Sequence, residues 1–259
     1  MLHIHDLTVV FRQGTSNELR ALDQLSCTIA KGDFVTIVGS NGAGKSTLLN
    51  AIHGVFPTPR GTILLDGDDI SMQKQHVRSR SIGRLYQDPM MGSAAHMSVL
   101  EHISMASHAH PFSLAFGVHK QEERKAKELL ACLQLGLEEQ LHTEVGTLSG
   151  GQRQALSLLL ATRATPKLLL LDEHTAALDP LTAKTIMQLT EQCVAQHQIT
   201  TLMITHDMKQ ALQYGNKLLV MNQGKISAVI DQKQKQELTL EKLLAIFEQK
   251  EIVISDRMI

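Results

Sequence analysis

The chain has 259 residues, which is enough for one large domain or two small ones with a substantial buried core. Lys and Arg number 25 against 26 for Asp and Glu, which gives a formal net charge of -1, and there is no Trp. This composition argues against a nucleic-acid partner, and no apolar run approaches the ~18 residues that cross a bilayer.

The chain begins with a weakly alternating segment, Leu2 to Phe11. Alternation of this kind is typical of a strand with one buried face, so we predict an antiparallel β subdomain at about residues 1–35. Residues 1–6 contain neither the charged region nor the long apolar region of a secretory signal. We therefore expect the protein to remain in the cytoplasm after synthesis.

Six short apolar runs predict further strands. Their apolarity is continuous rather than alternating, which indicates strands that are covered on both faces. Such strands favour an α/β fold with a mainly parallel sheet. The runs are Phe34–Val38, Ile63–Leu65, Ile82–Tyr86, Leu168–Leu171, Thr201–Ile204 and Lys217–Met221.

The stretch from about residue 89 to 163 has no strong strand pattern. Within it Ala126, Leu129, Leu130 and Leu133 recur at helical spacing among charged residues, which predicts an amphipathic helix. We expect a helical subdomain inserted into an α/β core formed by residues 33–88 and 164–224. Residues 225–259 are left as a short tail of the same domain, which spans 1–259.

A glycine-rich segment follows the first predicted core strand and precedes a helical run. Its glycines permit tight turns that point N–H groups at one anion, and the helix N-terminus adds a partial positive charge. Lys45 can reach the outer phosphates of a nucleotide, and Ser46 is the natural Mg²⁺ ligand. The pattern predicts a phosphate-binding loop rather than a plain turn. Its residues are Gly39, Ser40, Asn41, Gly42, Ala43, Gly44, Lys45, Ser46 and Thr47.

Two carboxylates, Asp172 and Glu173, follow the run of four leucines. Unpaired charge is costly at the end of a buried strand, so we expect a cation there. Successive strand side chains diverge, and we therefore assign Asp172 to Mg²⁺ and Glu173 to general-base activation of water. The simpler interpretation is that the pair caps the following turn.

A capped turn precedes the helical run Arg153–Arg163. Ser149 is predicted to be the N-cap, and the segment Gly150, Gly151 and Gln152 would form a second anion site. With one nucleotide per chain, this second site has no ligand within the same chain. A symmetric dimer in which Ser149 of one copy faces the γ-phosphate on the other uses both sites. A plain capped helix is the alternative.

Three further residues are candidates for the same site. Gln87 and His206 follow predicted strands, and open α/β sheets bind ligands at the carboxyl ends of their strands. We predict that His206 donates to the γ-phosphate and that Gln87 contacts Mg²⁺ or the attacking water. Phe11 is the nearest aromatic residue for stacking on adenine, with an ordinary core phenylalanine as the alternative.

Together these segments resemble the motifs of the ABC ATPase family in order and spacing, over roughly residues 2–224. Residues 39–47 match the Walker A loop, 148–152 the signature and 168–173 the Walker B strand, while Gln87, Asp179 and His206 match the Q-loop, D-loop and switch histidine. The resemblance implies a P-loop NTPase core and a homodimer that sandwiches ATP and Mg²⁺, with Ser149 and Gly151 reaching the partner's ATP.

One residue departs from the family pattern, because His174 stands where the family usually has proline after the Walker B glutamate. Proline would have fixed a backbone dihedral there. We expect the change to affect how rigidly Glu173 is held without abolishing hydrolysis, since both carboxylates remain.

In this family, a free-standing ATPase of this size usually serves a transporter with separate membrane subunits. The resemblance therefore implies transmembrane permease subunits, a solute-binding protein and a peripheral location on the cytoplasmic face of the cell membrane. It favours import of an amino acid or a similar small solute. The alternative is an ABC ATPase of a cytoplasmic assembly machine, such as iron–sulfur cluster scaffolding.

Overall fold

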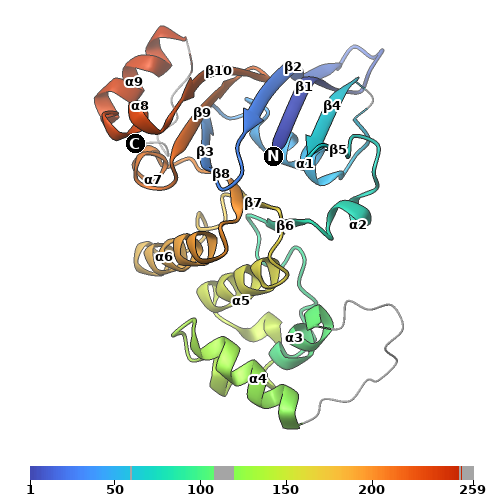
Figure 1. Cartoon of the computed structure of the whole chain (residues 1–259), viewed down its shortest axis with the longest axis vertical. Coiled ribbons are helices and arrows are strands. Elements are labelled where there is room, and N and C mark those ends of the chain that lie inside the picture. Colours follow the sequence, from blue (N-terminus) through green and yellow to red (C-terminus); the bar gives the residue numbers. More distant parts are fainter. Residues whose placement is uncertain (59, 108–119, 251, 253–259) are drawn as a thin grey trace. The chain divides into compact units, whose positions relative to one another are not determined.

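The computed structural model describes residues 1–58, 60–107, 120–250 and 252 (Figure 1). The chain forms two compact units, each of which is described by itself. The first unit contains residues 1–84, 165–173 and 194–259, and the second contains 85–164 and 174–193. The chain therefore passes between the units four times.

An antiparallel sheet of four strands, in the order β2-β1-β4-β5, belongs to the first unit. The sequence placed Ile63–Leu65 in the parallel core, and this is wrong, because β4 pairs antiparallel with β1 and sets Ile63 opposite Ile4. Only alternate residues of this run are buried, which suits a sheet that covers one face. The strands are β1 (Leu2–Phe11), β2 (Leu19–Ile29), β4 (Arg60–Leu65) and β5 (Asp68–Asp69).

A second sheet has six strands in the order β10-β9-β3-β8-β7-β6. β3 pairs parallel with β8 and β9, β7 pairs parallel with β8, and β10 pairs antiparallel with β9. The prediction of a mainly parallel sheet is thus confirmed. The strands are β3 (Phe34–Gly39), β6 (Ile82–Leu85), β7 (Leu168–Asp172), β8 (Thr200–Ile204), β9 (Lys217–Asn222) and β10 (Lys225–Ile230).

Apolar side chains cover both faces of the six-stranded sheet. On one face, Val35 and Ile37 share a core with α1 and the antiparallel sheet, and on the other face Val38 packs with residues of α7 and α9. This burial explains why every residue of β3 is apolar, glycine or threonine. The helices of this unit are α1 (Lys45–His53), α2 (Gln75–Arg78), α7 (Met208–Gln213), α8 (Gln232–Gln236) and α9 (Leu240–Gln249).

The second unit is helical and has its own apolar core. The predicted amphipathic helix is confirmed as α4, with Ala126 and Leu130 buried and Leu133 buried just beyond its end. None of the helices in the described ranges combines the length and apolarity needed to span a membrane. The remaining elements are α3 (Val99–Ser107), α4 (Lys120–Ala131), η1 (Leu137–Glu139), η2 (Val145–Thr147), α5 (Gly150–Arg163) and α6 (Pro180–His197).

Candidate active site

The glycine-rich loop connects the end of β3 to the start of α1, as the sequence predicts. Gly39 ends β3, and a Cβ at this position would collide with the backbone carbonyl of Met221 on β9. Gly44 precedes α1 with φ of 94°, in the left-handed region that favours glycine. Glycine is therefore required at both ends of the loop for the strand-to-helix turn to form.

Lys45 is buried inside this loop. Its Nζ donates hydrogen bonds to the carbonyl oxygens of Gly39 at 2.7 Å and Ser40 at 2.9 Å. Burial lowers the pKa of the Lys45 ammonium, while the nearby charges of Glu173 and Asp172 raise it. The loop thus surrounds a lysine whose ammonium interacts electrostatically with Asp172 and Glu173.

Asp172 lies at the end of β7 and contacts Ser46 of the glycine-rich loop. The Ser46 Oγ donates to Asp172 Oδ1 at 3.1 Å. A hydroxyl and a carboxylate are hard oxygen donors of the kind that Mg²⁺ takes. In the part of the chain that the structure describes, no group of three or more His, Cys, Asp or Glu gathers to hold a metal. The Ser46 hydroxyl and the Asp172 carboxylate would supply two oxygen ligands to a cation bound with phosphate.

Glu173 Oε1 contacts His206 Nε2 directly. Glu173 has φ of 48°, an uncommon backbone conformation for a residue with a side chain, and its N–H donates to the carbonyl of Ile204 at 3.2 Å. The ends of β7 and β8 thus bring together the two residues that the sequence assigned to base catalysis and to γ-phosphate contact.

The glycine-rich loop, Glu173 and His206 all line one cavity of about 270 Å³ in the first unit. Phe11 as a residue is 38% exposed beside this cavity, and its ring packs edge-to-face on Phe56 with the ring centroids 5.6 Å apart, so Phe11 is not an ordinary core residue. The cavity is lined by Phe11, Leu19, Ala21, Asn41, Gly42, Ala43, Gly44, Lys45, Ser46, Thr47, Glu173 and His206.

The predicted signature segment belongs to the second unit. Ser149 is the N-cap of α5 in a capping box, because its Oγ accepts from the Gln152 N–H while the Gln152 Oε1 accepts from the Ser149 N–H. This confirms the predicted cap. Gly150 is exposed, whereas Gly151 is buried where a Cβ would collide with the side chain of Thr182.

Gln87 and Asp179 also belong to the second unit. Gln87 is exposed and follows the end of β6 by two residues. The Asp179 Oδ1 accepts from the N–H of Thr182 at 3.1 Å, at the start of α6. Hydrogen bonds from the side chain of Thr182 first, and then from its backbone, lower the pKa of the Asp179 carboxyl. The predicted residues thus divide between the two units, and those of the second unit are described only within it.

Sequence reasoning missed Arg84, and it noted His174 without predicting that this residue is buried. The guanidinium of Arg84 on β6 lies 3.4 Å from Asp172, between Nη2 and Oδ2, and its side chain is 4% exposed. His174 is buried, and its Nε2 lies 3.2 Å from Thr190 Oγ1. The available signal for Arg84 was a single charged residue inside an otherwise apolar strand.

Comparison with known proteins identifies the family. The family model described as ABC transporter matches residues 22–176. A tyrosine transport ATP-binding protein of Clostridioides difficile is 40% identical over 248 residues, which cover 96% of this chain and 99% of that relative. The chain belongs to the ABC transporter family. It is an ATPase subunit of an ABC transporter, which confirms the resemblance seen in the sequence.

Other relatives and solved structures support the same family assignment. The methionine import ATP-binding protein MetN of Corynebacterium jeikeium is 35% identical over 225 residues, 85% of this chain but 58% of that protein. The ATP-binding cassette MJ1267 of an ABC transporter, in its ADP conformation, is 27% identical with a TM-score of 0.76, covering 96% and 98% of the two chains. The dimeric bacterial ABC transporter cassette MJ0796 is 26% identical with a TM-score of 0.74, covering 90% and 99%.

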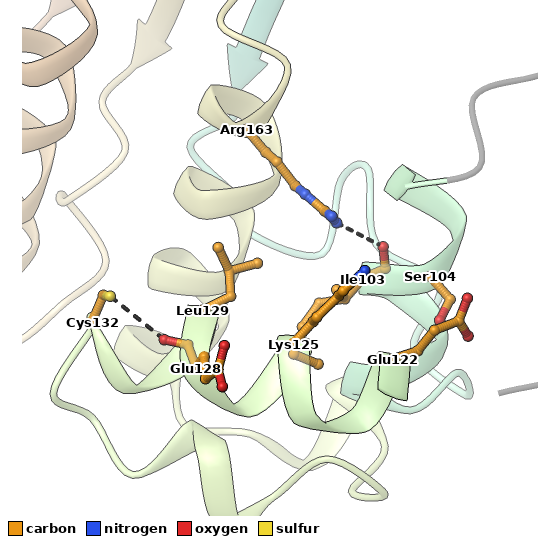
Figure 2. Close-up of a pocket in the computed structure, with 9 residues that line it drawn as sticks. Ile103, Ser104, Glu122, Lys125, Glu128, Leu129, Cys132 and Arg163 are labelled. Atoms are coloured by element: carbon orange, nitrogen blue, oxygen red, sulfur yellow. Dashed lines mark hydrogen bonds between the residues drawn. The ribbon is translucent and has the colours of Figure 1, made fainter. Parts of the chain in front are cut away.

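A larger cavity, of about 520 Å³, opens on the second unit between α3, α4 and the end of α5 (Figure 2). Its wall mixes Glu122 and Glu128 with Lys125 and Arg163, and the Arg163 guanidinium donates to the carbonyl of Ile103 at 3.1 Å. None of the predicted site residues lines it. The larger of these two cavities is therefore not the one that the sequence predicts as the site.

Proposed function

We propose that this ABC ATPase binds ATP in the cavity beside the glycine-rich loop and hydrolyses it there. Residues 39–47 cradle the phosphates, with Lys45 facing the outer ones, and Phe11 stacks on adenine. The observation that carries the proposal is that the loop, Phe11 and the Glu173–His206 pair all line one cavity. Each of these groups suits a different part of one nucleotide.

The same site is proposed to use Mg²⁺. Ser46 and Asp172 would hold the ion, together with Gln87 in the role that the family resemblance implies. When bound, Mg²⁺ neutralises negative charge on the phosphates and orients them for in-line attack. The contact between Ser46 Oγ and Asp172 Oδ1 supports this assignment, because it sets two oxygen donors side by side at the start of α1.

Glu173 is proposed to accept a proton from the attacking water, with His206 as its partner and as a donor to the γ-phosphate. A positioned general base typically contributes about 10²–10⁴ in rate. The contact between Glu173 and His206 supports the pairing of their roles, because both residues line the same cavity.

We further propose that two copies of the chain clamp ATP between them. Ser149, Gly150, Gly151, Gln152 and Asp179 of one copy would complete the site of the other. Ser149 caps the N-terminus of α5, and the first N–H groups of a helix point out of its N-terminus, as an anion site requires. The dimeric cassette among the similar structures supports this arrangement.

The proposed physiological role is import of an amino acid or a similar small solute through separate permease subunits, together with a solute-binding protein. The enzyme would then lie on the cytoplasmic face of the cell membrane. The relative named for tyrosine transport, which this chain matches almost end to end, favours an amino acid. The relatives named above favour transport over a cytoplasmic assembly machine.

The catalytic assignment is tested by two substitutions with different signatures. Glu173→Gln should reduce ATP turnover by about 10²–10⁴ while ATP binding is retained, because it removes the base and leaves the loop intact. Lys45→Ala should weaken ATP binding itself. Steady-state hydrolysis and equilibrium binding of ATP separate the two effects, and parental turnover by Glu173→Gln would contradict the role of Glu173.

The transport role is tested by expression of the tagged chain in its native host. The protein should copurify from detergent-solubilised membranes with integral membrane subunits. ATP hydrolysis by that complex should rise when tyrosine and its binding protein are added. Copurification with soluble assembly factors alone would instead support the assembly machine.

A further inference from the structure

Arg84 is a buried cation in the edge strand of the six-stranded sheet. It lies on β6, which neighbours β7, and its side chain is 4% exposed. A guanidinium stays charged in proteins, so burial requires a nearby counter-charge. The carboxylate of Asp172, at 3.4 Å, supplies negative charge there. Arg84 therefore connects a second strand to the carboxylate that is proposed to face the metal.

The Asp172 carboxylate is held at both of its oxygens. Oδ1 accepts from Ser46 Oγ at 3.1 Å, and Oδ2 accepts from Arg84 Nη2 at 3.4 Å. Two contacts on opposite oxygens restrict rotation of the carboxylate plane, which one contact does not. Oδ1 is thereby kept on the side of the glycine-rich loop and Oδ2 on the side of β6.

Lys45 offers the Asp172 carboxylate a competing cation. Burial lowers the pKa of the Lys45 ammonium, and the charges of Glu173 and then of Asp172 act in the opposite direction, so Asp172 lies within electrostatic range of this second cation. The contact of Oδ2 with Arg84 opposes rotation of the carboxylate toward this second cation. The charge of Arg84 also acts on His53 of α1. The pKa of the His53 imidazole is lowered to about 4, by burial first and then by the charges of Arg84 and Arg78.

We propose that Arg84 is a positioning residue that anchors Oδ2 of Asp172, so that Oδ1 stays beside Ser46 where the Mg²⁺ of bound ATP is held. This inference rests on the proposed ATP site. Groups that orient a metal ligand from outside the coordination shell typically contribute about 10- to 100-fold to metal affinity. The role of Arg84 should therefore be visible in how strongly Mg²⁺ improves nucleotide binding.

The test measures binding of a non-hydrolysable ATP analogue by titration calorimetry, in excess Mg²⁺ and in excess chelator. In Arg84→Met, the improvement in affinity that Mg²⁺ gives should fall by about 10- to 100-fold, with chelator-bound affinity unchanged. Arg84→Lys should restore part of the loss, because it keeps the charge but not the fork of the guanidinium. The matched control is Arg80→Met, on an exposed turn nearby, which should match the parent.

A second readout uses Mn²⁺ in place of Mg²⁺. The electron paramagnetic resonance spectrum of the bound Mn²⁺ should broaden in Arg84→Met, since the carboxylate no longer has a fixed orientation. Thermal unfolding reports whether Arg84→Met folds. If it does not, the affinities with and without Mg²⁺ are compared in Arg84→Lys and Arg84→Gln instead.

The outcomes separate this inference from the function on which it rests. Equal loss of affinity with and without Mg²⁺, or no change in the Mg²⁺ effect, would overturn the role of Arg84 while leaving the ATP site intact. A stronger Mg²⁺ effect would also overturn it, because Arg84 would then compete with the metal. Absence of any Mg²⁺ effect in the parent would instead contradict the proposed metal site.

Discussion

His174 has a definite tautomer in this structure. Its Nε2 lies 3.2 Å from Thr190 Oγ1, and that hydroxyl donates to the carbonyl of Ile186 at 2.8 Å. Because the hydroxyl hydrogen is used by Ile186, the Thr190 oxygen accepts from His174, which must carry its proton on Nε2. Both residues are buried, so a neutral imidazole at position 174 is part of the core of the second unit.

Stability in acid should depend on His174. Burial lowers its pKa from 6.5 to about 4. The unfolded chain therefore takes up a proton below pH 6.5 that the folded protein takes up only near pH 4, and the free energy of unfolding falls through this window. The loss from His174 should reach about 3 kcal/mol at pH 4.

Chemical denaturation of His174→Gln at a series of pH values tests this expectation. The dependence on pH between 6.5 and 4 should be flatter than in the parent, since the variant has no proton to take up there. His76→Gln, at an exposed histidine, should follow the parent curve. A His174→Gln curve as steep as the parent's would contradict a buried neutral imidazole.

At the residue level, local pattern predicted one part of the site better than another. The glycine-rich loop depends on neighbours in the chain, so its turn between strand and helix could be predicted from sequence. The contact of Arg84 with Asp172 joins residues 88 positions apart, and spacing along the chain contains no information on it. His174 was noted as a departure from the family pattern, but its partner Thr190 was not predictable for the same reason.

At the level of elements, α1 is held at its carboxyl end by a buried arginine. The guanidinium of Arg78 donates to the carbonyls of Ala51 at 2.7 Å and Ile52 at 2.8 Å, and to those of Ser71 at 2.8 Å and Gln73 at 3.0 Å. A cation there also complements the helix dipole. The same helix begins at the glycine-rich loop, so Arg78 supports the element that positions Lys45 and Ser46.

Replacement of Arg78 by methionine should destabilise the first unit by at least about 3 kcal/mol, because several buried carbonyls lose their donor together. Arg78→Lys should recover part of this loss, since an ammonium satisfies fewer of the four carbonyls. Urea unfolding measures both variants, with the exposed Arg80→Met as control. A loss below about 1 kcal/mol would mean that water replaces the guanidinium.

The strands show which elements sequence can and cannot assign. The run Leu168–Leu171, with continuous apolarity, is buried along its whole length and forms β7, an interior strand of the six-stranded sheet. Ile63–Leu65 was too short to distinguish continuous from alternating burial, and its pairing with β1 depends on residues about 60 positions away. Nearby residues were therefore enough to predict that a run forms a strand, but not which sheet that strand joins.

At the scale of the whole molecule, the proposed site residues divide between two units of one chain. Phe11, the glycine-rich loop, Asp172, Glu173 and His206 belong to the first unit, whereas Gln87, the signature and Asp179 belong to the second. One of the four passages between the units is the peptide bond that links Glu173 to His174. Mixed dimers can therefore test whether Ser149 completes the site of its own copy or the site of the other copy.

Two individually inactive variants should restore hydrolysis when mixed. In a symmetric dimer of Lys45→Ala, every site lacks the loop lysine, and in a dimer of Ser149→Arg every site has a blocked signature. A mixed dimer has one site with both defects and one site with neither. If the sites act independently, an equimolar mixture should regain roughly a quarter of parental ATP turnover, because about half of the dimers are mixed.

Measurement of ATP hydrolysis across mixing ratios distinguishes the two arrangements. Action between copies gives a maximum at equal amounts of the two variants, with the pure variants as built-in controls. Action within one copy leaves every mixture inactive, since each chain then contains one defective half of its own site. The Ser149→Arg chain should still bind ATP alone, because its glycine-rich loop is unchanged, and this shows that its inactivity reflects the missing clamp rather than misfolding.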